Sequence, residues 1–389
     1  MRSHIRGLLA AGACIVAVNS AAAQDKIRIG LIYTLTGPAS VLGQQSKNAF
    51  ELAVKDLGGK MGGKDVELFV ADDGLKPDVA IQKVSELIDR DKVDFVVGPI
   101  FSNVLQAIHK PVMDAGKILI STNAGASSFA GSACNANFFV TSYQNDQIYE
   151  TLGKVASDKG YKTVYAMVPN YQAGKDALAG FKRTYKGKIV EESLVPLNNL
   201  DFQPELSKLG SMKPDALFTF MPGGLGINLI KQFNQAGLQG KIPILSAFTA
   251  DEATLPALKG AADGIFGALT WAPSMNNPQN KKFVAEYEAA YHAIPASYAM
   301  QAYDAAMLID SAVRSLKGNV TDTKAVSAAL KKADFKSLRG PFKFNTNGYP
   351  IEDFYLTKVA KRADGNFQTE IVEKVLSGNA DEYAKDCKL

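Results

Sequence analysis

The chain has 389 residues, of which 47% are hydrophobic and 21% are charged, and its formal net charge is +4. This composition is typical of a globular protein, and the length exceeds what a single hydrophobic core commonly organises, so we expect two domains. No block of basic residues is present that would suit nucleic acid or an anionic membrane, so we expect neither as a partner.

Residues 1–23 have the pattern of an export signal. The basic stretch "MRSHIRG" precedes the apolar stretch "LLAAGACIVAV", which is too short to span a bilayer, and small residues suited to cleavage after Ala23 follow. Cys14 raises the alternative of a lipid anchor, but Ala11 replaces the usual leucine and the apolar run continues past the cysteine. We therefore expect an exported protein whose signal peptide is cleaved near Ala23.

Strands and helices alternate along the first part of the mature chain. Strands are predicted over residues 26–34, 65–73, 94–99 and 117–122, and helices over 44–59, 77–91 and from Ser102 onward. The short runs 94–99 and 117–122 are continuously apolar, as is typical of strands buried on both faces of a parallel sheet. The alternation indicates a doubly wound α/β domain.

The same alternation returns in the second part of the chain. Strands are predicted over 162–170, 188–196, 215–223, 242–247 and 264–273, with helices near 173–185, 202–210, 227–238 and 251–260. Two long helices from about 279 to 316 and a shorter one near 323–333 precede hairpins with turns at 345–348 and 363–365. Two such sheets predict two lobes, and a cleft between them is the expected ligand site.

Polar residues follow two neighbouring strands of the first predicted sheet. Ser102 opens a helix after the strand 94–99 and a Gly-Pro turn, and the strand 117–122 runs into the polar stretch "STNAGASS". A serine at a helix start commonly serves only as an N-cap, which remains an alternative here. Two polar strand ends in succession instead predict one wall of a ligand cleft.

The residue types needed for catalysis or metal binding are missing from the expected patterns. His109 and His292 have no Cys, Asp or Glu at metal-ligand spacing, and no nucleophile elbow, P-loop or dinucleotide fingerprint occurs. The stretch "PGGLGINL" lacks the P-loop lysine, so we interpret its glycines as a strand-to-helix turn that something approaches closely. We expect no catalytic residues, no metal and no cofactor, which favours binding over catalysis.

Two cysteines remain after the predicted signal peptide, Cys134 and Cys387. In an oxidising compartment a disulfide between them would tie the end of the chain to a loop near its middle. Two unpaired thiols remain the alternative.

Four segments of the chain resemble a known family. They are "RIGLIYTLTGPASVLGQQSKNAFELAV", "DFVVGPIFSNVLQAIHKPV", "YAMQAYDAAML" and "GPFKFNTNGYPIEDFYL". In this order they resemble the leucine/isoleucine/valine-type substrate-binding proteins of ABC transporters, from about Lys26 to beyond residue 370. The resemblance implies a monomeric periplasmic protein of the type I periplasmic-binding fold that works with the permease subunits of an importer.

The resemblance also implies how the chain is divided. The two lobes would be joined by three hinge crossings, near residues 143–146, 271–274 and 345–350. The first lobe would contain residues 24–143 and 274–345, and the second lobe residues 144–273 and 346–389.

By the resemblance, the two polar strand ends bind a carboxylate. Ser102 would offer its hydroxyl group and backbone N–H at a helix N-terminus, where unpaired N–H groups favour anions. Asn123 would lie at a second carboxylate contact, through backbone groups. Gly125 stands where amino-acid binders carry a hydroxyl residue that helps to hold the ammonium group.

On the opposite lobe the sequence departs from amino-acid binders. Ala173 stands in place of a tyrosine, with Tyr171 and Gln172 beside it, Phe248 lies where an acidic residue would pair with an ammonium group, and Leu42 replaces an aromatic residue. A buried ammonium group without a counter-charge costs several kcal/mol. The departures therefore favour a carboxylate with an apolar or aromatic body.

The predicted ligand-binding residues are Leu42, Phe101, Ser102, Asn123, Gly125, Tyr171, Gln172, Ala173, Met221, Gly223 and Phe248. Ordinary core packing remains the alternative for each apolar member. We expect capture of a small aromatic or hydrophobic carboxylate by hinge closure. A branched-chain or other neutral amino acid is the alternative ligand, and an extracellular sensor or a hydrolase is the alternative class.

Overall fold

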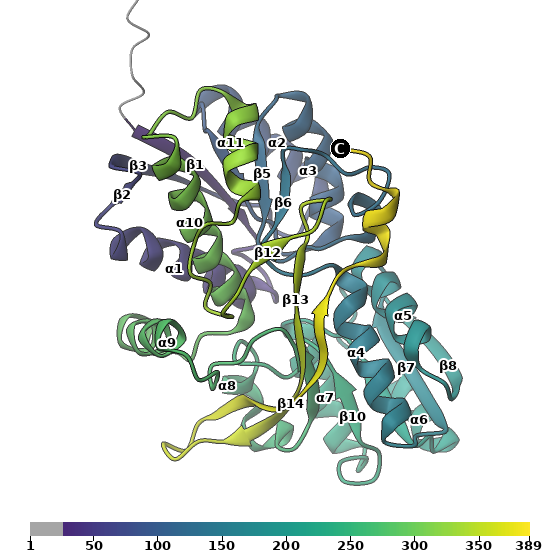
Figure 1. Ribbon diagram of the computed structural model, residues 1–389. Coiled ribbons are helices and arrows are strands. Elements are labelled where there is room, and N and C mark those ends of the chain that lie inside the picture. The colour runs from purple at the N-terminus through teal and green to yellow at the C-terminus, as the bar shows by residue number, and fades with distance from the viewer. Residues whose placement is uncertain (1–25) are drawn as a thin grey trace, which may run out of the picture.

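The computed structural model describes residues 26–389, so the predicted signal peptide lies outside the described residues. Two lobes, each built on its own sheet, lie one above the other (Figure 1). The first sheet has the strand order β2-β3-β1-β4-β5-β6, and all its pairs are parallel except β2 with β3. Its strands are β1 Lys26–Tyr33, β2 Lys60–Met61, β3 Lys64–Asp72, β4 Phe95–Val97, β5 Ile118–Ser121 and β6 Phe138–Val140.

Helices from both ends of the chain build the first lobe. They are α1 Ser40–Asp56, α2 Pro77–Ser85 with its π-helical extension Glu86–Arg90, α3 Ser102–Asp114, α9 Pro278–Tyr291, α10 Ser297–Ser315 and α11 Thr323–Lys331. Helix α10 is buried along nearly its whole length and packs on α1. The predicted helix 77–91 is present as α2 and its extension, and the extension has π rather than α geometry.

The second sheet has the order β12-β13-β11-β10-β9-β7-β8, with β14 paired to β13. Its strands are β7 Thr163–Pro169, β8 Lys188–Val195, β9 Ala216–Thr219, β10 Ile244–Ser246, β11 Phe266–Leu269, β12 Lys343–Phe344, β13 Pro350–Lys361 and β14 Phe367–Asn379. Its helices are α4 Asn145–Asp158, α5 Gln172–Thr184, α6 Gln203–Met212, α7 Gly224–Gln235 and α8 Leu255–Leu258. The strands β7 to β11 are parallel, and β13 adds to them antiparallel.

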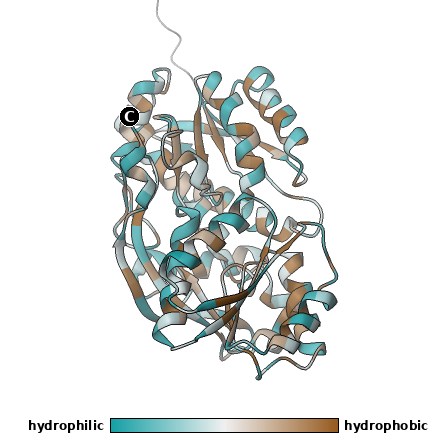
Figure 2. Ribbon diagram, turned by 90° about the vertical axis from the view of Figure 1, so that its right-hand side faces the viewer, coloured by the Kyte–Doolittle hydropathy of each residue, from teal (hydrophilic) through white to brown (hydrophobic). Residues whose placement is uncertain are grey.

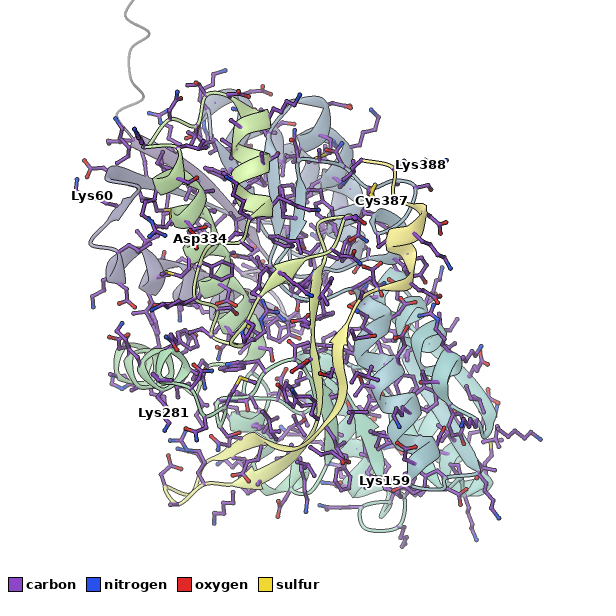
Figure 3. All side chains as sticks on the ribbon, in the orientation of Figure 1. Lys60, Lys159, Lys281, Asp334, Cys387 and Lys388 are labelled. Carbon is purple, nitrogen blue, oxygen red and sulfur yellow. A yellow bond between two sulfur atoms is a disulfide. The ribbon has the colours of Figure 1, made fainter. Side chains whose placement is uncertain are left out.

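The burial pattern explains why these segments form central strands. β4, β5 and β6 are buried at every position, so their apolar runs contact helices on both faces of the sheet. Figure 2 shows brown, hydrophobic strands inside both lobes and mixed colours on the helices. Charged side chains such as Lys60, Lys159 and Lys281 lie at the periphery (Figure 3). Among the described residues no helix combines the length and the apolar character needed to cross a membrane.

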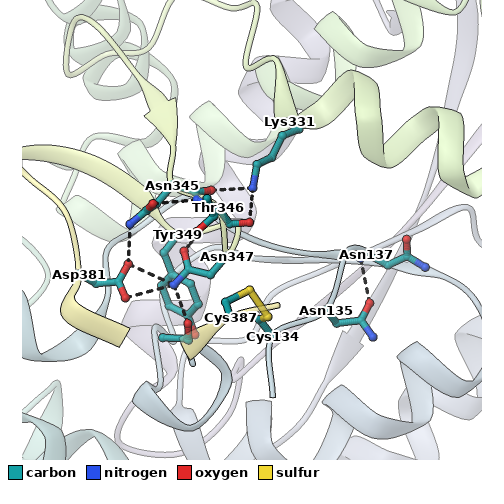
Figure 4. Close-up of a disulfide and its surroundings, with 11 residues drawn as sticks. Cys134, Asn135, Asn137, Lys331, Asn345, Thr346, Asn347, Tyr349, Asp381 and Cys387 are labelled. Atoms are coloured by element: carbon teal, nitrogen blue, oxygen red, sulfur yellow. Dashed lines mark hydrogen bonds between the residues drawn. A yellow bond between two sulfur atoms is a disulfide. The ribbon is translucent and has the colours of Figure 1, made fainter. Parts of the chain in front are cut away.

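The predicted connections between the lobes are present, and a further strand returns to the first lobe. The chain passes between the lobes after β6, after β11 and between α11 and β13. β14 then runs back along β13, and the short 3₁₀ helix η4, Glu382–Asp386, follows it. Cys387 is bonded there to Cys134 (Figure 4). The end of the chain thus lies against the first lobe, whereas the division drawn from the sequence places residues 346–389 with the second.

A buried ion network holds the hinge segments together. The Arg339 guanidinium donates to the backbone oxygens of Thr141 (2.7 Å) and Ser142 (2.9 Å), at the first crossing. It also pairs with Asp304 on α10 at 3.2 Å and with Glu352 on β13 at 2.6 Å. One cation therefore joins two of the crossings to the core of the first lobe.

Candidate functional site

A small cavity lies between the lobes, where the carboxyl ends of β4 and β5 face those of β7, β9 and β10. The space between atoms there is about 320 Å³, of which about 10 Å³ can hold the centre of a water molecule. It is lined by Leu42, Ile100, Phe101, Ser102, Asn123, Ala124, Tyr143, Asn145, Tyr149, Tyr171, Ala173, Phe220, Pro222, Phe248 and Tyr298. Both lobes contribute, so the cavity is closed off only because they lie together.

Ser102 is the first residue of α3, and its side chain is 1% exposed. The residue before it, Phe101, occupies the N-cap position and no side chain caps the helix. The hydroxyl oxygen of Ser102 instead accepts a hydrogen bond of 3.2 Å from the side-chain amide of Asn145. The N-cap alternative therefore does not describe this serine, which points toward the cavity at a helix N-terminus.

Asn123 joins the two strand ends of the first lobe. Its side-chain amide donates to the backbone oxygen of Ile100 at 2.7 Å, and its side-chain oxygen accepts from the Tyr143 hydroxyl at 3.2 Å. Its backbone oxygen accepts from the Ser142 hydroxyl at 2.9 Å. The Asn123 side chain is thus occupied within the protein and holds Tyr143 against the cavity.

Aromatic rings from both lobes form the rest of the wall. Tyr143 stacks on Phe248 with ring centroids 5.4 Å apart, and the tilted ring of Tyr298 lies 5.6 Å from that of Phe248. Tyr171 lies 6.2 Å from Phe220 in a stacked arrangement and 6.1 Å from Phe101. Offset and tilted rings at these separations attract one another and form an aromatic wall against which a further ring could pack.

Three tyrosine hydroxyls in this wall have no hydrogen bond to any described residue: those of Tyr149, Tyr171 and Tyr298. Burial raises the pKa of each phenol, so each stays protonated at neutral pH. The cavity thus offers neutral hydroxyl groups that can donate or accept, within an otherwise apolar wall.

The cavity has no charged side chain among its fifteen lining residues. The neighbouring carboxylate of Asp251 is 1% exposed and accepts from the backbone of Ala253 at 3.1 Å, and it does not line the cavity. Burial raises the pKa of Asp251 to about 6, so it is still mostly ionised at pH 7, and its position outside the cavity wall is what separates it from a ligand. The electrostatics therefore suit an anion held by hydroxyl and backbone donors, and they do not suit an ammonium group.

Four predicted residues are not brought to the cavity wall. Met221 is buried in the apolar core of the second lobe, and Gln172 bonds Ser127 and Asp176 between the lobes. A Cβ at Gly125 would lie 1.9 Å from the backbone oxygen of Tyr143, so this glycine permits close packing of the hinge. The structure thus departs from the prediction at Gly125, at Gln172 and at Met221.

Gly223 is the fourth. It precedes α7 with φ +60°, and a Cβ there would meet the backbone of Ala39 at 3.3 Å across the cleft. Beside it the backbone N–H of Gly224 donates to the Pro38 oxygen at 3.1 Å. The glycines of "PGGLGINL" therefore allow the two lobes to approach each other. They do not line the cavity.

Sequence reasoning missed eight lining residues: Ile100, Ala124, Tyr143, Asn145, Tyr149, Phe220, Pro222 and Tyr298. The alternation of side chains in an extended segment could have found two of them. Phe220 and Pro222 face the cavity while Met221, between them, faces the core. Tyr143 and Asn145 lie in the predicted first crossing. Because a hinge segment borders the cleft, its position could have indicated both residues.

A larger cavity, with about 1430 Å³ of space between atoms, lies away from the strand ends, between α8, α9 and the hairpin of β13 and β14. Charged residues of both signs line it, among them Lys259, Lys361 and Glu288. Within residues 26–389 no group of three or more His, Cys, Asp or Glu side chains is placed to hold a metal ion. The strand-end cavity therefore remains the candidate site.

Comparison with known proteins gives consistent matches over nearly the whole described chain. Residues 26–366 match the family described as "Periplasmic binding protein". The chain is 29% identical over 368 residues to the Leu/Ile/Val-binding protein homolog 6 of Brucella melitensis, covering 91% of this chain and 93% of that one.

Two solved structures are also similar. An ABC transporter solute-binding protein from R. palustris in complex with benzoate is 32% identical with a TM-score of 0.89, covering 94% of this chain and 100% of that one. A second, from Rhodopseudomonas palustris BisB5 in complex with 3,4-dihydroxy benzoic acid, is 31% identical with a TM-score of 0.87, covering 92% and 99%.

Proposed function

The chain belongs to the periplasmic binding protein family, and we propose that it captures a small aromatic carboxylate between its lobes and delivers it to the permease of an ABC importer. The observation that carries this proposal is the uncharged cavity. None of the fifteen lining residues is charged, while hydroxyl and backbone donors stand at the ends of β4 and β5.

The carboxylate would be held at the N-terminus of α3. The first backbone N–H groups of a helix lack partners within the helix and carry partial positive charge, which favours an anion. The Ser102 hydroxyl accepts from Asn145, so its own proton is available for a carboxylate oxygen. Hydrogen bonds to a charged acceptor in a site that excludes water are among the stronger ones in proteins.

The ring of the ligand would lie among the aromatic side chains. Phe248 contacts the rings of Tyr143, Tyr298 and Phe220, and Phe220 in turn contacts Tyr171, so the five rings form one connected aromatic wall. The unpartnered tyrosine hydroxyls would favour ring-hydroxylated acids, since a ring hydroxyl would satisfy them. The similar solved structures hold benzoate and 3,4-dihydroxy benzoic acid, which supports this choice of ligand class.

Capture would work by closure of the lobes. In the structure the backbone of Gly224 bonds that of Pro38 across the cleft, and the cavity leaves almost no room for water. A ligand would therefore enter while the lobes are apart and would then be contacted by both of them. These contacts would shift the balance toward the closed state. No step in this cycle needs a catalytic residue or a cofactor, and we propose a binding protein rather than an enzyme.

The proposed location is the periplasm. The family description is periplasmic, and the sequence of residues 1–23 has the pattern of an export signal. We propose cleavage near Ala23 and a monomer that meets the permease subunits of the importer.

A branched-chain amino acid is the second candidate ligand, because the Brucella relative is named as a Leu/Ile/Val-binding protein homolog. Its carboxylate could occupy the same donors. Its ammonium group would be buried without a counter-charge, at a cost of several kcal/mol. The uncharged wall therefore favours the aromatic acid.

Isothermal titration calorimetry with benzoate, 4-hydroxybenzoate and leucine tests the proposal. We expect both aromatic acids to bind and leucine to bind at least about 100-fold more weakly, from the cost of one unpaired charge. Ser102→Ala is expected to weaken benzoate binding by about 10- to 100-fold, the range for a hydrogen bond to a charged group. The control is Ser128→Ala, at an exposed serine outside the cavity, which should bind as the wild type does. Tight leucine binding with no binding of either acid would overturn the proposal.

A further inference from the structure

We propose that Asn145 and Asp176 position the Ser102 hydroxyl and join it to a hydrogen-bonded contact that forms between the lobes only on closure. This inference rests on the proposed function, because it takes the ligand to be a carboxylate bound at Ser102. It assigns a role to two residues outside the predicted site: Asn145 lines the cavity and Asp176 lies behind it.

The side-chain amide of Asn145 has its orientation set by its neighbours. Its oxygen accepts from the Gly125 backbone N–H at 3.1 Å, so its nitrogen must face the opposite direction. That nitrogen donates to the Ser102 hydroxyl oxygen at 3.2 Å and to Asp176 at 2.9 Å. Because Ser102 receives a hydrogen bond, its proton is directed away from Asn145 and toward the space where a carboxylate would lie.

Asp176 is a buried acceptor with four donors around it. It lies on α5 of the second lobe and is 4% exposed. One oxygen accepts from the Ser127 hydroxyl (2.6 Å) and from Gln172 (2.7 Å). The other oxygen accepts from the Ser127 backbone N–H (3.1 Å) and from Asn145. A protonated carboxyl group or an amide could not accept all four, so the site is built for a carboxylate.

The contact of Asp176 with Ser127 crosses the cleft. Ser127 follows β5 of the first lobe, whereas Asp176 and Asn145 belong to α5 and α4 of the second. Gln172 adds to the contact, since it donates to Ser127 at 3.3 Å and accepts from Gln106 on α3 at 3.2 Å. Separation of the lobes would remove these bonds and leave the Asp176 carboxylate partly unsatisfied. Closure therefore completes the acceptor that orients Asn145, which in turn orients the serine that binds the ligand.

The variant that tests this coupling is Asp176→Asn, which keeps the size of the side chain and removes two of its four acceptor positions. We expect benzoate to bind about 10- to 100-fold more weakly. The matched control is Asp158→Asn, an exposed carboxylate on α4 that pairs with Lys154, and it should bind as the wild type does. Ser127→Ala removes the partner in the first lobe and should reproduce part of the loss.

A second readout separates positioning from a merely structural role. Benzamide has the shape of benzoate without its charge. The affinity for benzoate divided by the affinity for benzamide therefore measures how well the carboxylate is recognised. We expect both Asp176→Asn and Asn145→Ala to lower this ratio. An equal loss for benzoate and benzamide, or no loss for either, would overturn the positioning role.

The lobe contact is measured without a ligand, so that its failure is distinct from failure of the proposed function. Spin labels at Lys110→Cys on α3 and Lys182→Cys on α5, both exposed, report the distance between the lobes. In ligand-free protein we expect Asp176→Asn and Ser127→Ala each to shift the distances toward the open form, and the double variant to shift them no further than Asp176→Asn alone. Unchanged distances would overturn the contact. Failure of the wild type to bind either acid would instead overturn the proposed function.

Discussion

Replacement of Glu252 by glutamine is expected to stabilise the protein at neutral and alkaline pH. Glu252 is 3% exposed. One carboxylate oxygen accepts from the backbone N–H and the hydroxyl group of Thr369, both at 2.6 Å, while the other has no partner. Burial, and then the neighbouring Asp251, raises the pKa of Glu252 from 4.5 to about 7. The ionised side chain is therefore tolerated at a cost.

The size and sign of the effect follow from that pKa. Each unit by which the pKa of Glu252 in the folded protein exceeds its pKa in the unfolded chain destabilises the ionised folded protein by about 1.4 kcal/mol. The total cost of ionising Glu252 is therefore about 3 kcal/mol. Because the pKa of Glu252 is higher in the folded protein, the contribution of its protonated form to stability is fully present below about pH 4.5. This contribution is lost as the pH rises to about 7. A glutamine keeps the acceptor for Thr369 and does not ionise, so it escapes this loss.

Urea unfolding of the wild type and of Glu252→Gln at pH 4.5 and pH 8 measures the effect. We expect the two proteins to have similar free energies of unfolding at pH 4.5. At pH 8 the variant is expected to be more stable by up to about 3 kcal/mol. Glu192→Gln, at an exposed carboxylate, controls for surface charge and should show no such difference between the two pH values. A stability difference that does not depend on pH would refute the reasoning.

Two further predictions concern links between distant parts of the chain. Reduction of the Cys134–Cys387 disulfide, whose cysteines are 253 residues apart, is expected to lower the free energy of unfolding by about 2–5 kcal/mol. Equal urea midpoints with and without reductant would contradict this. Arg339→Met is expected to cost about 3–5 kcal/mol, because Asp304 and Glu352 would remain buried without their cation. Urea unfolding of the variant and the wild type measures this difference in the free energy of unfolding. A decrease of less than about 1 kcal/mol would show that the network contributes little.

The local pattern of the chain predicted most of its secondary structure, but neither β6 nor α4 was among the predicted elements. The continuous apolar runs at 94–99 and 117–122 became β4 and β5, buried at every position. The turns near 345–348 and 363–365 connect β12, β13 and β14 as expected. These features depend on burial and turn chemistry within a few residues, which a single sequence contains.

The candidate site was predicted less completely, because its members come from distant segments. Ser102 and Asn123 stand at strand ends, where topology alone brings them to one edge of the sheet, and both line the cavity. Tyr298, on α10, and Tyr149, on α4, reach the cavity only through the packing of their helices. Whether Phe220 or Met221 faces the cavity depends on the register of one strand end, which the sequence leaves open by a residue.

By itself the sequence determined the α/β alternation, the two sheets and the polar strand ends, because each follows from periodicity and residue type along a short stretch. Only the tertiary structure decided that the cavity is lined by tyrosines without a charged partner, and that Asn145 and Asp176 stand behind Ser102. The make-up of the cavity wall and the contacts behind Ser102 depend on how closely the two lobes approach each other and on how they are aligned. Contacts between residues far apart in the chain settle both, and periodicity does not encode them.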